Sequence, residues 1–168
     1  MHGTMGKILS ALALAAALSL ATATSSAAQV HFGPQVSLAD DADVGLGGRI
    51  TAGVPQYAGL EFAGSFDVFF PDGNYDYWEI NGNVLHNFEI AGTTSFRPYA
   101  GGGLSIARRD FEGGDGPGDF RDDDTLVGLN LVGGTKFATE SPATPFVELR
   151  LEIEGGEQFV VTGGLLFP

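Results

Sequence analysis

Charged residues alternate with aliphatic ones in the segment PFVELRLEIE near the end of the chain. Glu148, Arg150 and Glu152 share one parity, whereas the residues between them are aliphatic. Because successive side chains of a β-strand point to opposite faces, this spacing places two carboxylates and a guanidinium on one face. An enclosed row of this kind can form ion pairs or conduct protons or ions. Further candidates with the same polar parity occur earlier in the chain: Arg49, Glu61, Glu79, Glu89, Arg97 and Lys136.

A dense acidic stretch, DFEGGDGPGDFRDDD, occupies residues 110–124. Carboxylates at this density could supply the six to eight oxygen ligands that Ca²⁺ takes, and the glycines would let the chain wrap the ion. The spacing does not match an EF-hand loop, so a solvated, self-repelling loop is the simpler interpretation. The candidate Ca²⁺ ligands are Asp115, Asp119, Asp122, Asp123 and Asp124.

The N-terminus has the pattern of a secretory signal peptide. A short segment ending in Lys7 precedes the apolar run ILSALALAAALSLATA, and small residues at Ser26 and Ala28 match a cleavage site. The apolar run is short of the ~20 residues that span a bilayer as a helix. We therefore expect residues 1–28 to be a cleaved signal peptide and residues 29–168 to form one exported domain.

The composition of the predicted mature chain excludes several functions. Loss of Lys7 leaves seven Lys and Arg against 21 Asp and Glu, a net charge of −14, which disfavours nucleic acid as a partner. The chain has no cysteine, so neither disulfides nor thiolate metal sites can form.

The hydrophobic pattern after residue 28 has a period of two nearly everywhere and predicts an all-β protein. Turn signals divide the chain into eight expected strands: 29–38, 43–53, 57–70, 76–90, 95–109, 125–138, 145–154 and 157–167. One face is apolar throughout, and the other carries the charges and amides. Two closed structures fit: a secreted soluble barrel with its apolar face inside, and a membrane barrel with its apolar face in lipid.

Three features favour the membrane barrel. The expected strands reach or exceed the roughly 9 to 11 residues that cross a bilayer at a tilt. The glycines on the apolar face would leave voids in a soluble core, whereas fluid lipid fills them; they are Gly48, Gly64, Gly82, Gly102, Gly133 and Gly163. Aromatic residues near the expected strand ends are typical of interfacial girdles: Phe32, Phe70, Tyr75, Tyr77, Trp78, Phe88, Phe96, Phe137, Phe159 and Phe167.

The lengths of the connections predict the orientation. An even number of strands places both ends of the barrel domain on one side, expected to be periplasmic. Connections 39–42, 71–75, 110–124 and 155–156 then face outward, and 54–56, 91–94 and 139–144 face the periplasm. The longest connection, 110–124, falls on the outward side, where membrane barrels carry their long loops.

These features together resemble the family of small eight-stranded bacterial outer-membrane β-barrels, which includes outer membrane protein X and the transmembrane domain of outer membrane protein A. The resemblance extends over the mature chain and includes RPYAGGGLSIA, similar to a glycine-rich mid-barrel strand, and the ending QFVVTGGLLF. In that ending, Phe159, Val161, Leu165 and Phe167 resemble the family's C-terminal signal for the barrel-assembly machinery, although Pro168 follows the last Phe. The resemblance implies an antiparallel up-and-down transmembrane barrel in the outer membrane of a Gram-negative-type bacterium.

Some barrels of this kind resemble lipid A deacylases or palmitoyltransferases, which use a histidine with a serine and an acid. The mature chain has only His31 and His86, and neither has the His-x-Ser spacing of the deacylases. We therefore expect no enzymatic activity and no cofactor beyond the Ca²⁺ considered for 110–124.

The polar face then becomes the interior, where Arg49, Arg97 and Lys136 are expected to meet Glu61, Glu79 or Glu89. Eight strands leave room for little more than side chains, which favours a plug of ion pairs over an ion path. We expect a monomer with a structural or surface-interaction role. Its partners are expected to be outer-membrane lipid and lipopolysaccharide, which divalent ions would bridge to the acidic loop. The outward loops could also meet a host surface or another protein. The alternatives are a secreted soluble barrel that binds a small apolar ligand and a narrow, porin-like ion-conducting pore.

Overall fold

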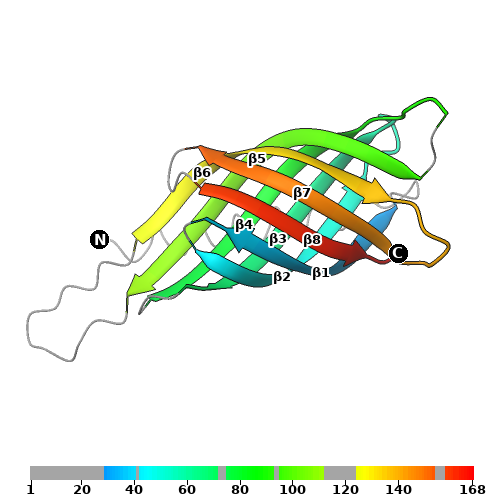
Figure 1. The fold of residues 1–168 in the computed structure, drawn as a ribbon. Coiled ribbons are helices and arrows are strands. Elements are labelled where there is room, and N and C mark those ends of the chain that lie inside the picture. The colour runs from blue at the N-terminus through cyan, green and yellow to red at the C-terminus, as the bar shows by residue number, and fades with distance from the viewer. Residues whose placement is uncertain (1–28, 41, 72–74, 93–94, 112–123, 154–157) are drawn as a thin grey trace, which may run out of the picture.

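The protein is a single closed β-barrel in the computed structural model, which describes residues 29–40, 42–71, 75–92, 95–111, 124–153 and 158–168 (Figure 1). The strands are β1 (Val30–Ala39), β2 (Asp43–Gly53), β3 (Leu60–Phe70), β4 (Tyr75–Asn87), β5 (Phe96–Phe111), β6 (Asp124–Phe137), β7 (Thr144–Ile153) and β8 (Gln158–Leu166). Each strand pairs antiparallel with the next, and β1 pairs antiparallel with β8. The fold is therefore the predicted up-and-down barrel.

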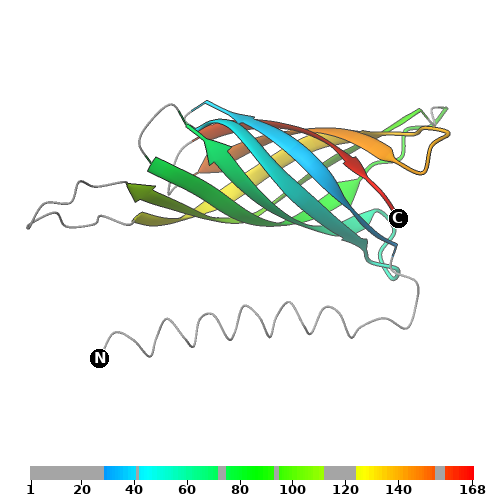
Figure 2. The same cartoon turned by 90° about the horizontal axis from the view of Figure 1, so that it is seen from below.

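The seam between β1 and β8 closes the barrel. Five residue pairs join the two strands, from Gln35 opposite Gly164 to Ala39 opposite Val160. A separate bridge pairs Phe32 with Phe167, which exchange two backbone hydrogen bonds of 2.9 and 2.8 Å. This bridge places Pro168 beside the start of β1, as Figure 2 shows. We call the opening at this end, which holds Gln29 and Pro168, the proximal mouth, and the opposite opening the distal mouth.

The predicted strands are confirmed, with ends that differ by at most three residues. The largest differences are at the start of β3 and the end of β4. Residues 57–59 form turns instead of strand, since Tyr57 N–H donates to Val54 O and Leu60 N–H donates to Tyr57 O, both at 3.0 Å. Gly59 adopts a φ of 82°, which an extended strand does not accommodate.

Most large apolar side chains of the strands point away from the barrel. Val127 is 60% exposed and Phe32 58%, whereas Glu79 and Asp67 have no exposed surface. A soluble barrel requires the opposite arrangement, so the alternative of a secreted soluble barrel is wrong. Within the described ranges, no helix has the length and hydropathy of a membrane span.

The aromatic girdle prediction is wrong at Tyr77. Its side chain is 2% exposed and lies inside the barrel, whereas its neighbour Trp78 faces outward beside Phe66, with 6.1 Å between ring centroids. Adjacent residues of a strand face opposite ways, so both cannot belong to an outer girdle. The side chain of Tyr75 lies outside the described residues.

Inward-facing glycines make room for large interior side chains. A Cβ added at Gly45 would lie 2.8 Å from two ring carbons of Phe69, and one at Gly164 would lie 2.6 Å from Cε1 of Phe146. Both rings are buried. By contrast, a Cβ at the outward Gly82 or Gly133 would meet nothing within 4 Å. Glycine is therefore a steric requirement at the inward positions 45 and 164, whereas a larger residue fits at the outward positions 82 and 133.

This difference predicts opposite effects of two alanine substitutions. Gly164→Ala places its Cβ against Phe146 and Pro34 O, so we expect the protein to lose about 1–3 kcal/mol of unfolding free energy through overpacking. Gly133→Ala is the matched control, and it should leave stability unchanged or raise it by up to about 1 kcal/mol, because alanine restricts the unfolded chain. Urea unfolding of protein folded into lipid vesicles measures both. Equal effects of the two substitutions would contradict the steric assignment.

Candidate functional site in the barrel interior

A buried ion pair between Arg49 on β2 and Glu148 on β7 crosses the middle of the barrel. The Arg49 Nη2 to Glu148 Oε2 distance is 2.5 Å, and the side chains are 3% and 1% exposed. The hydroxyl of Tyr99 donates to the same carboxylate oxygen at 2.9 Å, and the guanidinium lies 4.6 Å from the ring centroid of Phe146. Arg49 thus meets Glu148, and not one of the three glutamates expected from the sequence.

A second cluster surrounds Arg150 on β7. Its Nη2 lies 2.6 Å from Glu79 Oε1 on β4, and its Nε lies 3.2 Å from Glu152 Oε1. The Gln158 amide on β8 donates to both carboxylates at 3.0 Å and to the hydroxyl oxygen of Tyr77 at 2.9 Å. These contacts connect strands on opposite sides of the barrel.

Amides and hydroxyls extend this network. Gln35 Nε2 donates to both carboxylate oxygens of Asp67 at 2.8 Å, and Ser37 Oγ donates to Asp67 at 3.2 Å. Asn130 Nδ2 donates to the amide oxygens of Asn81 and Asn83 at 2.8 and 3.1 Å. Side chains from six strands, β1, β3, β4, β6, β7 and β8, thus fill the inside of the barrel with polar contacts.

The buried interior is acidic. Among the described residues, four buried side chains are carboxylates and two are guanidiniums: Asp67, Glu79, Glu148 and Glu152, and Arg49 and Arg150. Each guanidinium lies against at least one carboxylate, whereas Asp67 accepts hydrogen bonds from the neutral side chains of Gln35 and Ser37. Loss of either arginine would therefore leave a buried carboxylate without a positive partner.

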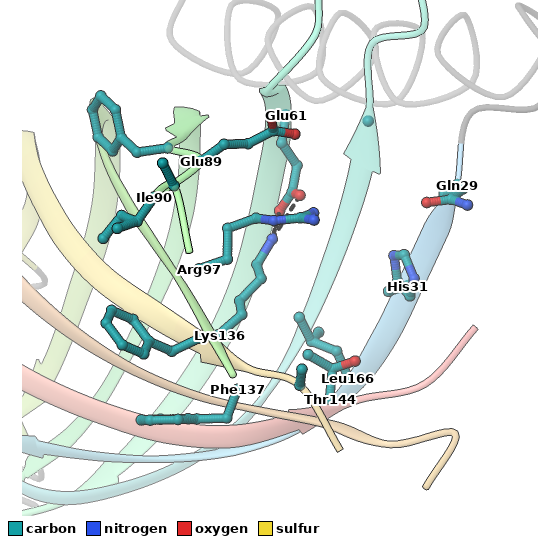
Figure 3. Close-up of a pocket in the computed structure, with 15 residues that line it drawn as sticks. Gln29, His31, Glu61, Glu89, Ile90, Arg97, Lys136, Phe137, Thr144 and Leu166 are labelled. Atoms are coloured by element: carbon teal, nitrogen blue, oxygen red, sulfur yellow. Dashed lines mark hydrogen bonds and ion pairs between the residues drawn. The ribbon is translucent and has the colours of Figure 1, made fainter. Parts of the chain in front are cut away.

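The proximal mouth holds the remaining charged residues that the sequence predicted for the interior: Glu61, Glu89, Arg97 and Lys136. Lys136 Nζ on β6 lies 2.6 Å from both carboxylate oxygens of Glu61 on β3. The lysine also lies 5.5 Å from the ring centroid of Tyr99. Figure 3 shows the pair of Lys136 and Glu61, with Arg97 extending into the cavity at this mouth. The side chains of Arg97 and Glu89 are exposed, and neither side chain has a hydrogen bond or ion pair within the part of the chain that the structure describes.

An open cavity of about 710 Å³ occupies this mouth. Its charged lining consists of Glu61, Glu89, Arg97 and Lys136, and Gln29 and His31 add polar atoms. Its apolar lining includes Phe88, Ile90, Phe96, Phe137 and Leu166. A cavity of this size with a few convergent polar groups has the dimensions of a small-molecule site.

The remaining sequence-predicted residues lie elsewhere. Asp115, Asp119, Asp122 and Asp123 lie outside the described residues, as does the side chain of Asp124. In the described ranges, no three His, Asp or Glu side chains gather as a metal site would require. Phe159 and Leu165 are exposed on the outer face of β8, and Val161 and Phe167 are half-buried at the same parity. His31 lines the proximal cavity, and His86 faces outward, with its ring 4.9 Å from that of Phe88.

Four residues of the interior network were not predicted from the sequence: Ser37, Tyr77, Tyr99 and Gln158. Tyr77 is two residues from Glu79 and Tyr99 two from Arg97, so each tyrosine has the parity of a charged residue in its own strand. That parity was the available signal. Grouping aromatic residues by their nearness to strand ends concealed it.

Comparison with solved structures identifies the class of fold. The N-terminal β-barrel domain of Pseudomonas aeruginosa OprF aligns with a TM-score of 0.66 at 15% identity and covers 82% of this chain and 95% of that chain. Neisserial surface protein A (NspA) aligns at 0.58 and 18% identity, covering 82% and 94%. Ail, the attachment invasion locus protein of Yersinia pestis, aligns at 0.58 and 14%, covering 82% and 93%.

The chain therefore has the fold of the small eight-stranded outer-membrane β-barrels, as the resemblance in the sequence implied. No family model matches the sequence, and a search of curated proteins finds no match. At sequence identities of 14–18%, the likeness to these structures shows the fold, and it does not show the function.

The Arg150 cluster predicts a large loss of stability on substitution. Arg150→Met leaves the buried carboxylates of Glu79 and Glu152 without a positive partner, which should lower the unfolding free energy by about 3–5 kcal/mol. Arg97→Met is the matched control, because Arg97 is exposed, and its effect should stay within about 0.5 kcal/mol. Urea titrations of vesicle-folded protein measure both. If the two variants unfold at the same urea concentration, the Arg150 cluster does not stabilise the barrel.

Proposed function

We propose that this protein is a non-enzymatic outer-membrane β-barrel with a structural or surface-interaction role and a plugged polar interior. The observation that carries the proposal is the reversal of the two faces: aliphatic and aromatic side chains point outward, and charged side chains are buried inside. A closed barrel in lipid requires this arrangement, because its outer side chains meet hydrocarbon and its inner ones do not. The bacterial outer-membrane barrels that share the fold support the location.

The contacts across the barrel support a plug. Arg49 reaches Glu148 and Gln158 reaches Glu79 from non-adjacent strands, so the side chains bridge the space that a channel would need. Eight strands enclose a space that side chains nearly fill. The pairs also satisfy charges that would otherwise be buried alone.

The outward segment 110–124 supports a surface role for the distal end. Its seven carboxylates favour cationic partners, or divalent ions such as Ca²⁺ that bridge it to lipopolysaccharide phosphates. Among the proteins of the same fold, NspA is a surface protein, and Ail has been solved with the heparin analogue sucrose octasulfate. Sucrose octasulfate is polyanionic, so the acidic segment of this chain would select partners of the opposite charge.

The absence of a catalytic role rests on the two histidines of residues 29–168. In the described part of the chain, neither His31 nor His86 hydrogen-bonds a serine or an acid. His31 lines the proximal cavity, whereas His86 faces outward beside Phe88. A nucleophile needs a positioned base within hydrogen-bond reach.

We further propose that the protein acts as a monomer. We also propose that the barrel-assembly machinery recognises a signal on β8 that consists of Phe159, Val161, Leu165 and Phe167.

A narrow pore is the second candidate, because several buried polar atoms have no protein partner. They include Thr51 Oγ1 and Glu148 Oε1. Water molecules satisfy such atoms in protein interiors, and a chain of waters would turn the interior into a path for cations.

Orientation is tested by labelling single cysteines, since the chain has none of its own. Asp76→Cys is near the distal mouth and should react with a membrane-impermeant maleimide on whole cells, whereas Tyr57→Cys is near the proximal mouth and should react only after lysis. Both residues are exposed, so a difference reports the membrane side and not burial. Labelling of Tyr57→Cys alone on intact cells would reverse the proposed orientation.

Conductance separates the plug from the pore. The folded protein in planar bilayers should show no discrete current steps, because the Arg49–Glu148 and Arg150–Glu79 contacts cross its interior. A heat-unfolded sample provides the baseline. Reproducible cation-selective steps from the folded protein alone would replace the plug with the pore.

A further inference from the structure

The proximal mouth holds two positive charges directly opposite each other. Arg97 on β5 and Lys136 on β6 are cross-strand partners, and both point inward. Like charges at such positions repel each other. Lys136 is neutralised by Glu61 at 2.6 Å, whereas Arg97 has no counterion among the described residues. The pair therefore leaves one guanidinium available for an anion.

A free carboxylate lies on the other side of Arg97. The hydrogen bond from Phe88 N–H to Pro98 O, 2.8 Å long, continues the β4–β5 ladder past Asn87. In that register Glu89 lies across from Arg97, and its carboxylate likewise has no hydrogen bond or ion pair in the described chain. The mouth thus presents an unpaired negative group beside an unpaired positive group, both lining one cavity (Figure 3).

The same cavity reaches the outer surface of the barrel. Glu89, Arg97 and Lys136 have inward parity, but Phe88, Phe96 and Phe137 also line it, although they face outward and are 45%, 41% and 39% exposed. Phe96 and Phe137 are themselves cross-strand partners on β5 and β6. The cavity therefore passes over the barrel rim, from the charged mouth to the lipid-facing aromatic surface.

We propose that this rim binds a zwitterionic phospholipid of the adjoining leaflet, with a phosphate and a primary ammonium in its head group. The phosphate accepts hydrogen bonds from the Arg97 guanidinium, whose planar fork matches two phosphate oxygens, and Lys136 adds a second positive charge. Glu89 accepts from the ammonium. The acyl chains lie on Phe88, Phe96 and Phe137.

Charge complementarity distinguishes this ligand from an anionic lipid. The predicted mature chain carries a net charge of −14, and Glu89 stands beside the phosphate site, so a head group with net negative charge is repelled. With the proximal mouth on the periplasmic side, the lipid would come from the leaflet that faces the periplasm, and this assignment rests on the proposed function. The binding of the lipid by the residues of the rim does not depend on the orientation of the barrel.

The test is a titration of the folded, isotope-labelled protein in maltoside micelles with dihexanoyl phosphatidylethanolamine. We expect saturable NMR shifts at the Arg97 side-chain Nε–H and the amides of Ala91 and Ala138, and no shift at Ala107 near the distal mouth. Dihexanoyl phosphatidylglycerol should bind about threefold or more weakly, because it lacks the ammonium. Arg97→Gln should weaken both lipids about tenfold, the effect of losing one charge-assisted hydrogen-bonding group. Arg109→Gln, which removes a cation near the distal mouth, is the matched control and should change neither.

Four results would each overturn a stated part of the proposal. Unchanged binding by Arg97→Gln, or shifts spread evenly over the outer surface, would remove the site. A preference for phosphatidylethanolamine that persists in Glu89→Gln would remove the ammonium contact. Equal affinity for the soluble head group glycerophosphoethanolamine would remove the acyl contact with the rim. The titration is independent of the cell, so a reversed orientation in the cysteine-labelling experiment would change the source leaflet and leave the micelle result standing.

Discussion

Each strand of this barrel has to find hydrogen-bonding partners on both of its edges, because hydrocarbon offers none. The β1–β8 seam is where that requirement is hardest to meet. Pro34 lacks an N–H group, and the paired residues of the seam stop at Gln35 before resuming at Phe32. Asp40 compensates at the other end, where Phe159 N–H donates to its carboxylate at 2.8 Å and its own N–H donates to Phe159 O at 3.2 Å. Closure therefore extends beyond the regular ladder.

Closure in lipid then determines what the interior contains. Once the aliphatic residues face outward, the alternate positions must point inward, and the charges of Arg49, Glu79 and Arg150 have to neutralise one another in a confined space. Large rings share that space, and the ring of Phe69 fits because Gly45 opposite it lacks a Cβ. Glycine content, ion pairing and barrel closure are thus consequences of one constraint.

The middle of the barrel and the proximal mouth differ in how completely their charges are satisfied. In the middle, Gln158 and Tyr99 donate to carboxylates that already contact arginines, so the network is densely connected. At the proximal mouth, Arg97 and Glu89 carry charges that nothing in the described chain neutralises. A stability role explains the first group, whereas the second is available for a ligand. Ligand binding is therefore proposed for the rim, and the plug for the middle of the barrel.

The sequence by itself determined the strands and the assignment of their faces, because a period of two is a local property that eight consecutive segments repeat. It also placed Glu148, Arg150 and Glu152 on the interior face. It did not determine that Arg49 meets Glu148, because the height of one strand relative to another depends on the stagger of the closed barrel and not on periodicity. The same stagger brings Tyr77 to Gln158 and sets Arg97 opposite Lys136. Contacts between distant strands, and the cavity that they leave at the proximal mouth, were decided only by the tertiary structure.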